Sequence, residues 1–128
     1  MTKTRVLVVD DSALVRSLLT EIINRQPDME CVGAASDPYA AREMIRSLNP
    51  DVITLDIEMP RMDGYELAAH LKSGNFARIP ILMLTSRAGK KHRDRAKEIG
   101  VDDYLIKPFQ DEALLTAIRS AVDAARRT

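Results

Sequence analysis

Short apolar segments alternate with longer amphipathic segments along the whole chain. The apolar segments are rich in Val and Ile and are too short for helices, which is typical of strands buried on both faces of a sheet. They lie at residues 5–9, 30–35, 52–55, 79–84 and 102–106. Amphipathic helices are predicted around residues 14–22, 38–48, 65–72, 89–99 and 111–126. This alternation predicts an α/β fold, with a parallel sheet, right-handed crossovers and helices on both faces.

Capping and turn residues separate these segments. Asp11 or Ser12 can cap the first helix, and Asp37-Pro38 is a start signal for the second. Asn49-Pro50 and Gly100 mark helix ends. Spacings of three and four residues predict the core-facing positions of the helices: Leu14, Val15, Leu18, Leu19 and Ile22 in the first, Ala41, Met44, Ile45 and Leu48 in the second, and Leu114, Leu115, Ile118 and Val122 in the last.

The composition fits a single cytoplasmic domain that covers residues 1–128. Lys and Arg, 19 in total, balance 19 Asp and Glu, so no global field favours nucleic acid or an anionic membrane. The first apolar run, Val6 to Val9, is too short for a signal peptide or a membrane span. The one cysteine, Cys31, rules out an internal disulfide, and its apolar neighbours predict a core residue without a chemical role.

Polar residues follow four of the predicted strands at the point where each strand ends. Asp10 and Asp11 follow the first strand, Asp56 the third, Thr85 the fourth and Lys107 the fifth. Parallel strands bring these endings to one edge of the sheet, where α/β folds keep their ligand sites. We therefore expect three carboxylates, a hydroxyl and an ammonium group to lie close together.

Three carboxylates in one cleft repel each other unless a cation shares their charge. Mg²⁺ is the favoured ion, because it takes oxygen ligands and commonly combines carboxylates with substrate phosphate. With the Lys107 ammonium group, it would supply the positive charge that a transferred phosphoryl group needs. The site is therefore interpreted as a phosphoryl acceptor in which Asp56 forms an aspartyl phosphate. An Asp-Asp pair alone more often caps a helix, but Asp56 and Lys107 at matching strand ends favour the metal site.

Four motifs carry a family resemblance across essentially the whole chain. They are, in order, VLVVDDS, LDIEMPRMDG, MLTS and YLIKPF, and they resemble the receiver domain of response regulators in two-component signalling. Residues 4–70 are similar to the receiver of the chemotaxis methylesterase, whereas MLTSRAGKKHRDRAKEIGVDDYL is similar to the receivers of hybrid chemotaxis kinases. The chain stops at Thr128 before any effector domain, which is compatible with an excised, a stand-alone or a composite receiver.

The resemblance implies a flavodoxin-like (βα)5 three-layer sandwich with the parallel strand order 2-1-3-4-5. It also implies that Asp56 accepts the phosphoryl group. Asp10, Asp11, Asp56 itself and the backbone carbonyl of Glu58 would hold Mg²⁺.

Further roles follow from the same resemblance. Thr85 would bind a phosphoryl oxygen, Lys107 would pair with Asp56 or its phosphate, and the bond between Lys107 and Pro108 would be a cis peptide. Tyr104 occupies the place of an aromatic side chain that turns inward when Thr85 moves. A half-buried strand aromatic without a switching role fits that position too.

The resemblance implies that the phosphodonor is a histidine kinase or a phosphotransfer domain, or a small phosphodonor. Phosphorylation would alter the binding of an output domain or partner protein at the face built from the fourth helix, fifth strand and fifth helix. The domain would be a monomer or a phosphorylation-dependent dimer that contacts neither nucleic acid nor membrane directly. It would assist its own phosphorylation and dephosphorylation without being an enzyme that turns over a substrate.

Two charged features add hypotheses. Glu58 and Arg87 follow Asp56 and Thr85 by two residues, and we hypothesise that they pair over the pocket and hinder hydrolysis of the aspartyl phosphate. The fourth helix is strongly basic, which solvation explains; the alternative is that it meets acids of a partner subunit. The basic residues are Lys90, Lys91, His92, Arg93, Arg95 and Lys97, and the candidate acids are Asp102 and Asp103.

Two other classes of function stay open at this point. An aspartyl-phosphate hydrolase would share the strand-end acid and the lysine, but it needs a second acid two residues after the nucleophile and a cap over its substrate. Glu58 meets the first requirement weakly, and no cap insertion is present in the sequence. A docking module that leaves the site unused is the other alternative.

Overall fold

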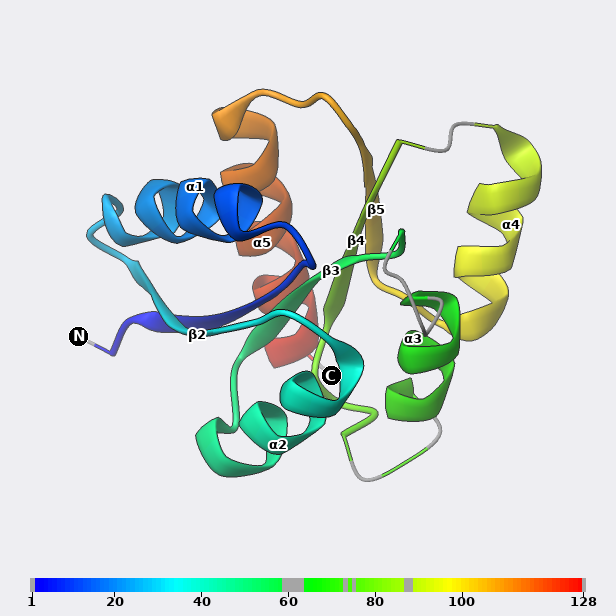
Figure 1. Cartoon of the computed structure of the whole chain (residues 1–128), viewed down its shortest axis with the longest axis horizontal. Helices are drawn as coiled ribbons and strands as arrows, with labels where there is room; N and C mark the ends of the chain where they lie inside the picture. Colours follow the sequence, from blue (N-terminus) through cyan, green and yellow to red (C-terminus); the bar gives the residue numbers. More distant parts are fainter. Residues whose placement is uncertain (1, 59–63, 73, 75, 87–88, 128) are drawn as a thin grey trace.

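A single parallel sheet organises the part of the chain that the computed structural model describes, which is residues 2–58, 64–72, 74, 76–86 and 89–127. Its strands are β1 (Thr4–Val9), β2 (Met29–Ala35), β3 (Val52–Asp56), β4 (Ile81–Thr85) and β5 (Asp103–Ile106). They pair in the order β2-β1-β3-β4-β5 (Figure 1), so the expected α/β class and strand order are confirmed.

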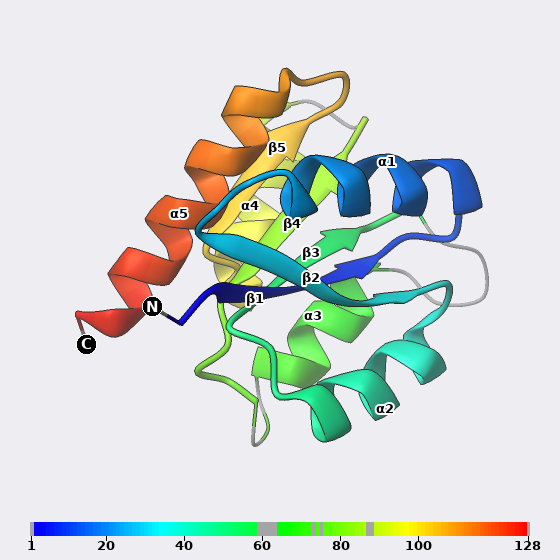
Figure 2. The ribbon, with the colours of Figure 1, turned by 90° about the vertical axis from the view of Figure 1, so that its left-hand side faces the viewer.

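Helices cover both faces of this sheet. They are α1 (Ala13–Asn24), α2 (Pro38–Leu48), α3 (Gly64–Lys72), α4 (Lys90–Ile99) and α5 (Asp111–Arg126). Helices α1 and α5 lie on one face and α2 and α3 on the other (Figure 2), and α4 packs on the same face as α2 and α3 through Ala96 and Ile99. None of these helices is both long enough and apolar enough to cross a bilayer.

Two hydrophobic clusters fill the spaces between the sheet and its helices. In β1, Val6 and Val8 belong to the cluster under α1 and α5, whereas Leu7 and Val9 belong to the cluster under α2, α3 and α4. This alternation follows from the two-residue side-chain period of a strand, and burial on both faces explains why the strand sequence is continuously apolar. The rigid sheet between the clusters fixes where each strand ends.

Capping groups set the helix ends close to the predicted positions. The Ser12 hydroxyl accepts a hydrogen bond from the Val15 amide at 3.3 Å, and the Asp37 carboxylate accepts one from the Ala40 amide at 2.8 Å. Gly100 ends α4 in the left-handed conformation, with φ of 96°. The clearest boundary difference is β4, which begins at Ile81 rather than residue 79, because Pro80 precedes the ladder and only its carbonyl accepts a bond.

The predicted core face of α1 is partly wrong. Leu19 and Ile23 are buried against the sheet, and Val15 and Ile22 pack beside them. Leu14 and Leu18 are instead 70% and 49% exposed. The apolar stripe of this helix is wider than the surface that the sheet and α5 cover, so periodicity alone could not choose which edge of the stripe faces inward.

A glycine allows α2 to approach β2 closely. A Cβ atom at Gly33 would lie 2.9 Å from Cδ1 of Leu48 and 3.3 Å from Sδ of Met44. These two α2 residues were expected to face inward, and both lie over this strand. A larger residue at position 33 would force the side chains of Leu48 and Met44 to shift.

A lysine ties the start of β5 to neighbouring segments. The Lys72 ammonium group donates to the Ile79 carbonyl at 3.0 Å and to Oδ2 of Asp102 at 2.8 Å. The same carboxylate oxygen accepts a hydrogen bond from the Ile81 amide at 2.8 Å. Asp102 was a candidate acid for a partner subunit, but it is engaged within its own chain.

Candidate metal and phosphoryl-acceptor site

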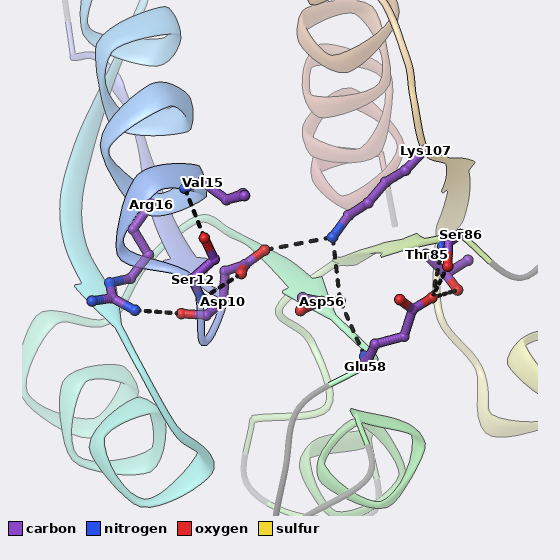
Figure 3. A network of polar contacts seen from close by, with 9 residues as sticks. All are labelled: Asp10, Ser12, Val15, Arg16, Asp56, Glu58, Thr85, Ser86 and Lys107. Carbon is purple, nitrogen blue, oxygen red and sulfur yellow. Dashed lines mark hydrogen bonds and ion pairs between the residues drawn. The ribbon is translucent and has the colours of Figure 1, made fainter.

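The endings of β1, β3, β4 and β5 meet at the carboxyl edge of the sheet, as the sequence predicts. Asp10 follows β1, Asp56 and Thr85 are the last residues of β3 and β4, and Lys107 follows β5. Figure 3 shows these side chains around one cleft. The fold therefore brings together residues that are up to 97 positions apart in the chain.

Three carboxylates form the acidic part of this cleft. One oxygen from each of Asp10, Asp11 and Asp56 lies within 4.8 Å of the others. Asp10 and Asp56 are 1% and 3% exposed, whereas Asp11 is open to solvent. Two buried carboxylates this close together carry a high electrostatic cost when ionised.

The two carboxylate oxygens of Asp10 differ in their hydrogen bonding. Its amide donates to the Ala35 carbonyl at 3.0 Å, and Oδ1 accepts from the Ser12 amide at 2.9 Å. The other carboxylate oxygen, Oδ2, is buried and has no hydrogen-bond partner among the described residues. The Lys107 Nζ atom lies 3.7 Å from this oxygen. A buried oxygen in this state favours a ligand that the described residues do not supply.

Burial governs the ionisation of the two inward acids. It raises the pKa of Asp10 and outweighs the hydrogen bond from Ser12 and the attraction of Lys107. Burial also raises the pKa of Asp56, and the negative charge of Asp10 adds to this effect, while the Glu58 amide and Lys107 oppose it. Both acids therefore lose stabilisation in their ionised forms, which a bound cation would restore.

Lys107 provides the positive charge within the cleft. Its Nζ atom lies 3.4 Å from Oδ1 of Asp56, the oxygen that also accepts the Glu58 amide at 3.0 Å. Its backbone amide donates to the Thr85 carbonyl at 2.7 Å, which fixes the end of β5 against β4. The peptide bond to Pro108 is cis, as expected.

The carboxylate of Glu58 lies on the far side of the cleft from Asp10. Its Oε1 atom accepts hydrogen bonds from the Thr85 hydroxyl at 2.9 Å, the Ser86 amide at 2.7 Å and the Ser86 hydroxyl at 2.7 Å. Burial would raise its pKa, but the bonds from Ser86 and Thr85 outweigh burial and lower it. Ser86 had no predicted role, because a serine after a strand looks like an ordinary turn residue.

Two other predicted residues stay untested in their roles. Arg87 lies outside the described residues, so its pairing with Glu58 remains a hypothesis. Tyr104 is half buried and packs against the cluster under α2, α3 and α4. Its register partner in β4 is Met83, two residues before Thr85.

The described residues fit a magnesium ion. The donor set consists of carboxylate oxygens, which is the chemistry that Mg²⁺ selects. The unpartnered Asp10 oxygen lies in the same cluster as Asp11 and Asp56, and both inward acids are penalised in ionised form. These observations come from the chain alone, and each of them favours a hard cation at this place.

Comparison with known families agrees with this geometry. The family model described as "Response regulator receiver domain" matches residues 6–119. The chain belongs to this family, and it is a receiver domain of the chemotaxis type.

Proteins similar to this chain include a protein-glutamate methylesterase/protein-glutamine glutaminase of Nitrosomonas europaea, which is 49% identical over 97% of the chain. A protein of the same description from Albidiferax ferrireducens is 57% identical over 83% of the chain. The chain spans 33% and 28% of these two proteins, respectively.

Solved structures give the same result. The response regulator domain of Thermotoga maritima CheB superposes with a TM-score of 0.85 at 37% identity, and the match covers 94% of this chain and 97% of that chain. The chemotaxis protein CheY4 of Vibrio cholerae superposes with a TM-score of 0.86 at 29% identity, covering 94% and 99%. The flavodoxin-like receiver fold is thus shown. The resemblance of the C-terminal half to hybrid kinases stays a prediction.

We predict that Asp10→Asn stabilises the metal-free domain at pH 7 by about 1–2 kcal/mol, because it removes a buried charge from a functional site. The pKa of Asp10 is higher in the folded state than its ordinary value of 3.8. The protonated acid therefore contributes to stability below pH 3.8, and this contribution is lost as the pH rises through the pKa of the folded state. The gain should therefore shrink as the pH is lowered towards 3.8.

Urea unfolding in EDTA at several pH values measures this gain. The exposed α5 variant Asp123→Asn is the matched control and should change little. Destabilisation by Asp10→Asn at pH 7 would contradict the prediction. Added Mg²⁺ should stabilise the unmodified chain by mass action, and this stabilisation should be lost in Asp10→Asn.

Proposed function

We propose that the chain is a phosphorylation-controlled switch in which Asp56 accepts a phosphoryl group. The donor is the phosphohistidine of a histidine kinase or phosphotransfer domain, or a small phosphodonor, and the setting is the cytoplasm. The observation that carries this proposal is the position of Asp56, which is buried at a strand end between two other carboxylates and the Lys107 ammonium group.

In the proposed reaction, a carboxylate oxygen of Asp56 attacks the phosphorus atom. A bond from that oxygen to phosphorus forms while the bond from phosphorus to the donor nitrogen breaks, and the imidazole leaves with the electron pair and takes up a proton. Oδ1 already accepts hydrogen bonds from Glu58 and Lys107, which leaves Oδ2 as the proposed nucleophile. The Glu58 amide fixes the orientation of the carboxylate for this attack.

Asp10, Asp11, Asp56 and the backbone carbonyl of Glu58 are the proposed ligands of Mg²⁺, which when bound would offset the charge of the carboxylates and of the phosphoryl oxygens. Lys107 has the same electrostatic purpose within the chain itself. Its Nζ atom already lies near both Asp10 and Asp56. From there it can donate to a phosphoryl oxygen on Asp56.

Thr85 must change partners for its proposed role. Its hydroxyl donates to Glu58, and the same Glu58 oxygen also holds the amide and hydroxyl of Ser86. A phosphoryl oxygen on Asp56 would compete with Glu58 for the Thr85 hydroxyl. Phosphorylation would therefore break one of the three hydrogen bonds to Glu58 and move the Thr85 side chain at the end of β4, which is a two-state change of the kind that can bias partner binding.

The proposed output is the face formed by α4, β5 and α5. The end of β4 is bonded to the end of β5, and Tyr104 in β5 packs towards the α4 side of the sheet. A displacement of Thr85 could reach this face through Tyr104. An output domain or partner protein would then bind this face with changed affinity. The chain itself would be a monomer or a phosphorylation-dependent dimer.

A catalytic role with turnover is not part of the proposal. Glu58 would have to act as the second acid of a hydrolase, but three donors on one oxygen hold its carboxylate in the ionised form. The methylesterase relatives are about three times as long as this chain, so their named activity is not proposed for it.

Leu14 and Leu18 suggest where the phosphodonor protein docks. They are exposed on the first turns of α1, which begins directly after the Asp10-Asp11-Ser12 turn. Exposed apolar side chains beside a reactive site are typical of a protein contact. We propose that the kinase or phosphotransfer domain covers them while its phosphohistidine faces Asp56.

Incubation with acetyl phosphate and Mg²⁺ tests the acceptor role. Intact-mass measurement should show the addition of one phosphoryl group, which is lost in Asp56→Ala and in EDTA. A chain that gains no such mass would be a docking module instead. Sustained release of inorganic phosphate from a small phosphate ester would indicate a hydrolase.

Glu58→Gln should lengthen the lifetime of the phosphorylated form by about fivefold, because a neutral amide competes less well than a carboxylate for the Thr85 hydroxyl. Loss of the label from purified phosphoprotein measures this lifetime, and Glu66→Gln on the exposed side of α3 is the matched control. A shortened lifetime would instead favour the shielding hypothesis with Arg87. An unchanged lifetime would reject both ideas.

The double change Leu14→Ala and Leu18→Ala should slow phosphotransfer from an autophosphorylated chemotaxis histidine kinase by about tenfold, the loss expected for an interface anchor. Labelling by acetyl phosphate should stay unchanged, because the small donor needs no protein contact. Tyr39→Ala, at another exposed apolar residue, is the control. Equal slowing with both donors would mean that the variant damages the site rather than the docking surface.

A further inference from the structure

Arg16 contacts the acidic cleft from behind. Its Nη1 atom donates to the backbone carbonyl of Asp10 at 2.8 Å. The guanidinium group reaches this carbonyl from α1, and Figure 3 shows it on the side of the Asp10 turn that faces away from Lys107. Arg16 was not among the candidate site residues, because an arginine on an amphipathic helix looks like a solvated position.

The contact completes the fixation of Asp10. Its amide is bonded to Ala35, Oδ1 to the Ser12 amide and the carbonyl to Arg16. Within the described part of the chain, Oδ2 is the Asp10 polar atom left without a hydrogen bond, and it lies near Lys107. Three hydrogen bonds therefore fix Asp10 so that its fourth polar atom, Oδ2, faces the cleft.

The same contact fixes the next residue as well. The Asp10 carbonyl belongs to the peptide unit that joins Asp10 to Asp11, so holding this oxygen sets the plane from which the Asp11 side chain projects. Asp11 is exposed and has no carboxylate hydrogen bond of its own among those found in the described residues. The position of the Asp11 carboxylate in the acidic cluster thus depends on the conformation of the Asp10–Asp11 backbone.

The anchor is rigid because α1 holds it. Arg16 lies one turn into the helix, and its amide donates to the Ser12 carbonyl at 3.0 Å. The Ser12 hydroxyl caps the same turn. Ser12 and Arg16, both at the start of α1, therefore fix the conformation of the turn. A planar guanidinium group also loses less conformational entropy than an ammonium group when it makes such a hydrogen bond.

We propose that Arg16 is a positioning residue of the magnesium site, which sets the orientation of the Asp10–Asp11 peptide so that both carboxylates face Asp56. This inference rests on the proposed function. Groups that orient metal ligands commonly contribute 10–100-fold to metal affinity, and we expect a loss of about that size when Arg16 can no longer donate.

The test is a Mg²⁺ titration of the whole chain, followed by amide NMR shifts, with Arg16→Met as the main variant. Methionine keeps an unbranched apolar side chain but has no donor, so the Kd should rise about 10–100-fold. Arg16→Lys retains an ammonium group that can donate, so its Kd should lie between those of the unmodified chain and Arg16→Met. Arg25→Ala, at the C-cap of α1, removes an exposed ion pair with Glu21 and should bind as the unmodified chain does.

A second readout separates positioning from general structural damage. With acetyl phosphate, Arg16→Met should need more Mg²⁺ for half-maximal labelling but should reach the same rate at saturating Mg²⁺. Circular dichroism in EDTA establishes that the variant is folded. Should Arg16→Met not fold, Arg16→Gln takes its place under the same criteria, because its shorter side chain cannot reach the carbonyl.

The outcomes are distinct. A folded variant with an unchanged Kd overturns the inference, and so does a lowered saturating rate with an unchanged Kd. Failure of the unmodified chain itself to bind Mg²⁺ would reject the proposed function rather than the role of Arg16. A raised Kd with partial recovery in Arg16→Lys supports positioning by hydrogen-bond donation.

Discussion

Repulsion among Asp10, Asp11 and Asp56 is the constraint on which the rest of the site depends. One oxygen of each lies within 4.8 Å of the others, and two of the three side chains are buried. Such an arrangement would separate in a flexible loop. It persists because strands buried on both faces fix two of the acids, and the sheet cannot adjust without disturbing both hydrophobic clusters. The site is thus held in an electrostatically costly state that a bound cation would relieve.

The cleft has two halves with opposite hydrogen-bond needs (Figure 3). On one side, one oxygen of the Asp10 carboxylate receives no hydrogen bond from the residues that the structure describes. On the other side, Glu58 occupies the donors of Thr85 and Ser86. Lys107 lies between the halves and contacts both buried acids. A phosphoryl group on Asp56 would suit both halves. Its oxygens could accept hydrogen bonds on the side of Thr85 and Ser86, and its negative charge would be offset by Lys107 and by a cation on the side of Asp10.

Most of the architecture and the convergence of the main candidate site residues follow from sequence, since strand ends are marked by a change from apolar to polar residues. Asp10, Asp56, Thr85 and Lys107 were found in this way. What could not be predicted depends on the direction of side chains. The wide apolar stripe of α1 did not reveal that Leu18 faces solvent, and the partners of Glu58 depend on a rotamer. These choices are made by tertiary packing, which local periodicity does not encode.

Strand β5 is an edge strand held at both of its ends. At its start, Asp102 is bonded to Lys72 and to Ile81, and at its finish, Lys107 is bonded to Thr85. Strand β5 therefore cannot shift along β4 without breaking the bonds at one of its ends. If phosphorylation moves Thr85 as proposed, these bonds favour rotation of Tyr104 or tilting of α4 over a shift of β5 along β4.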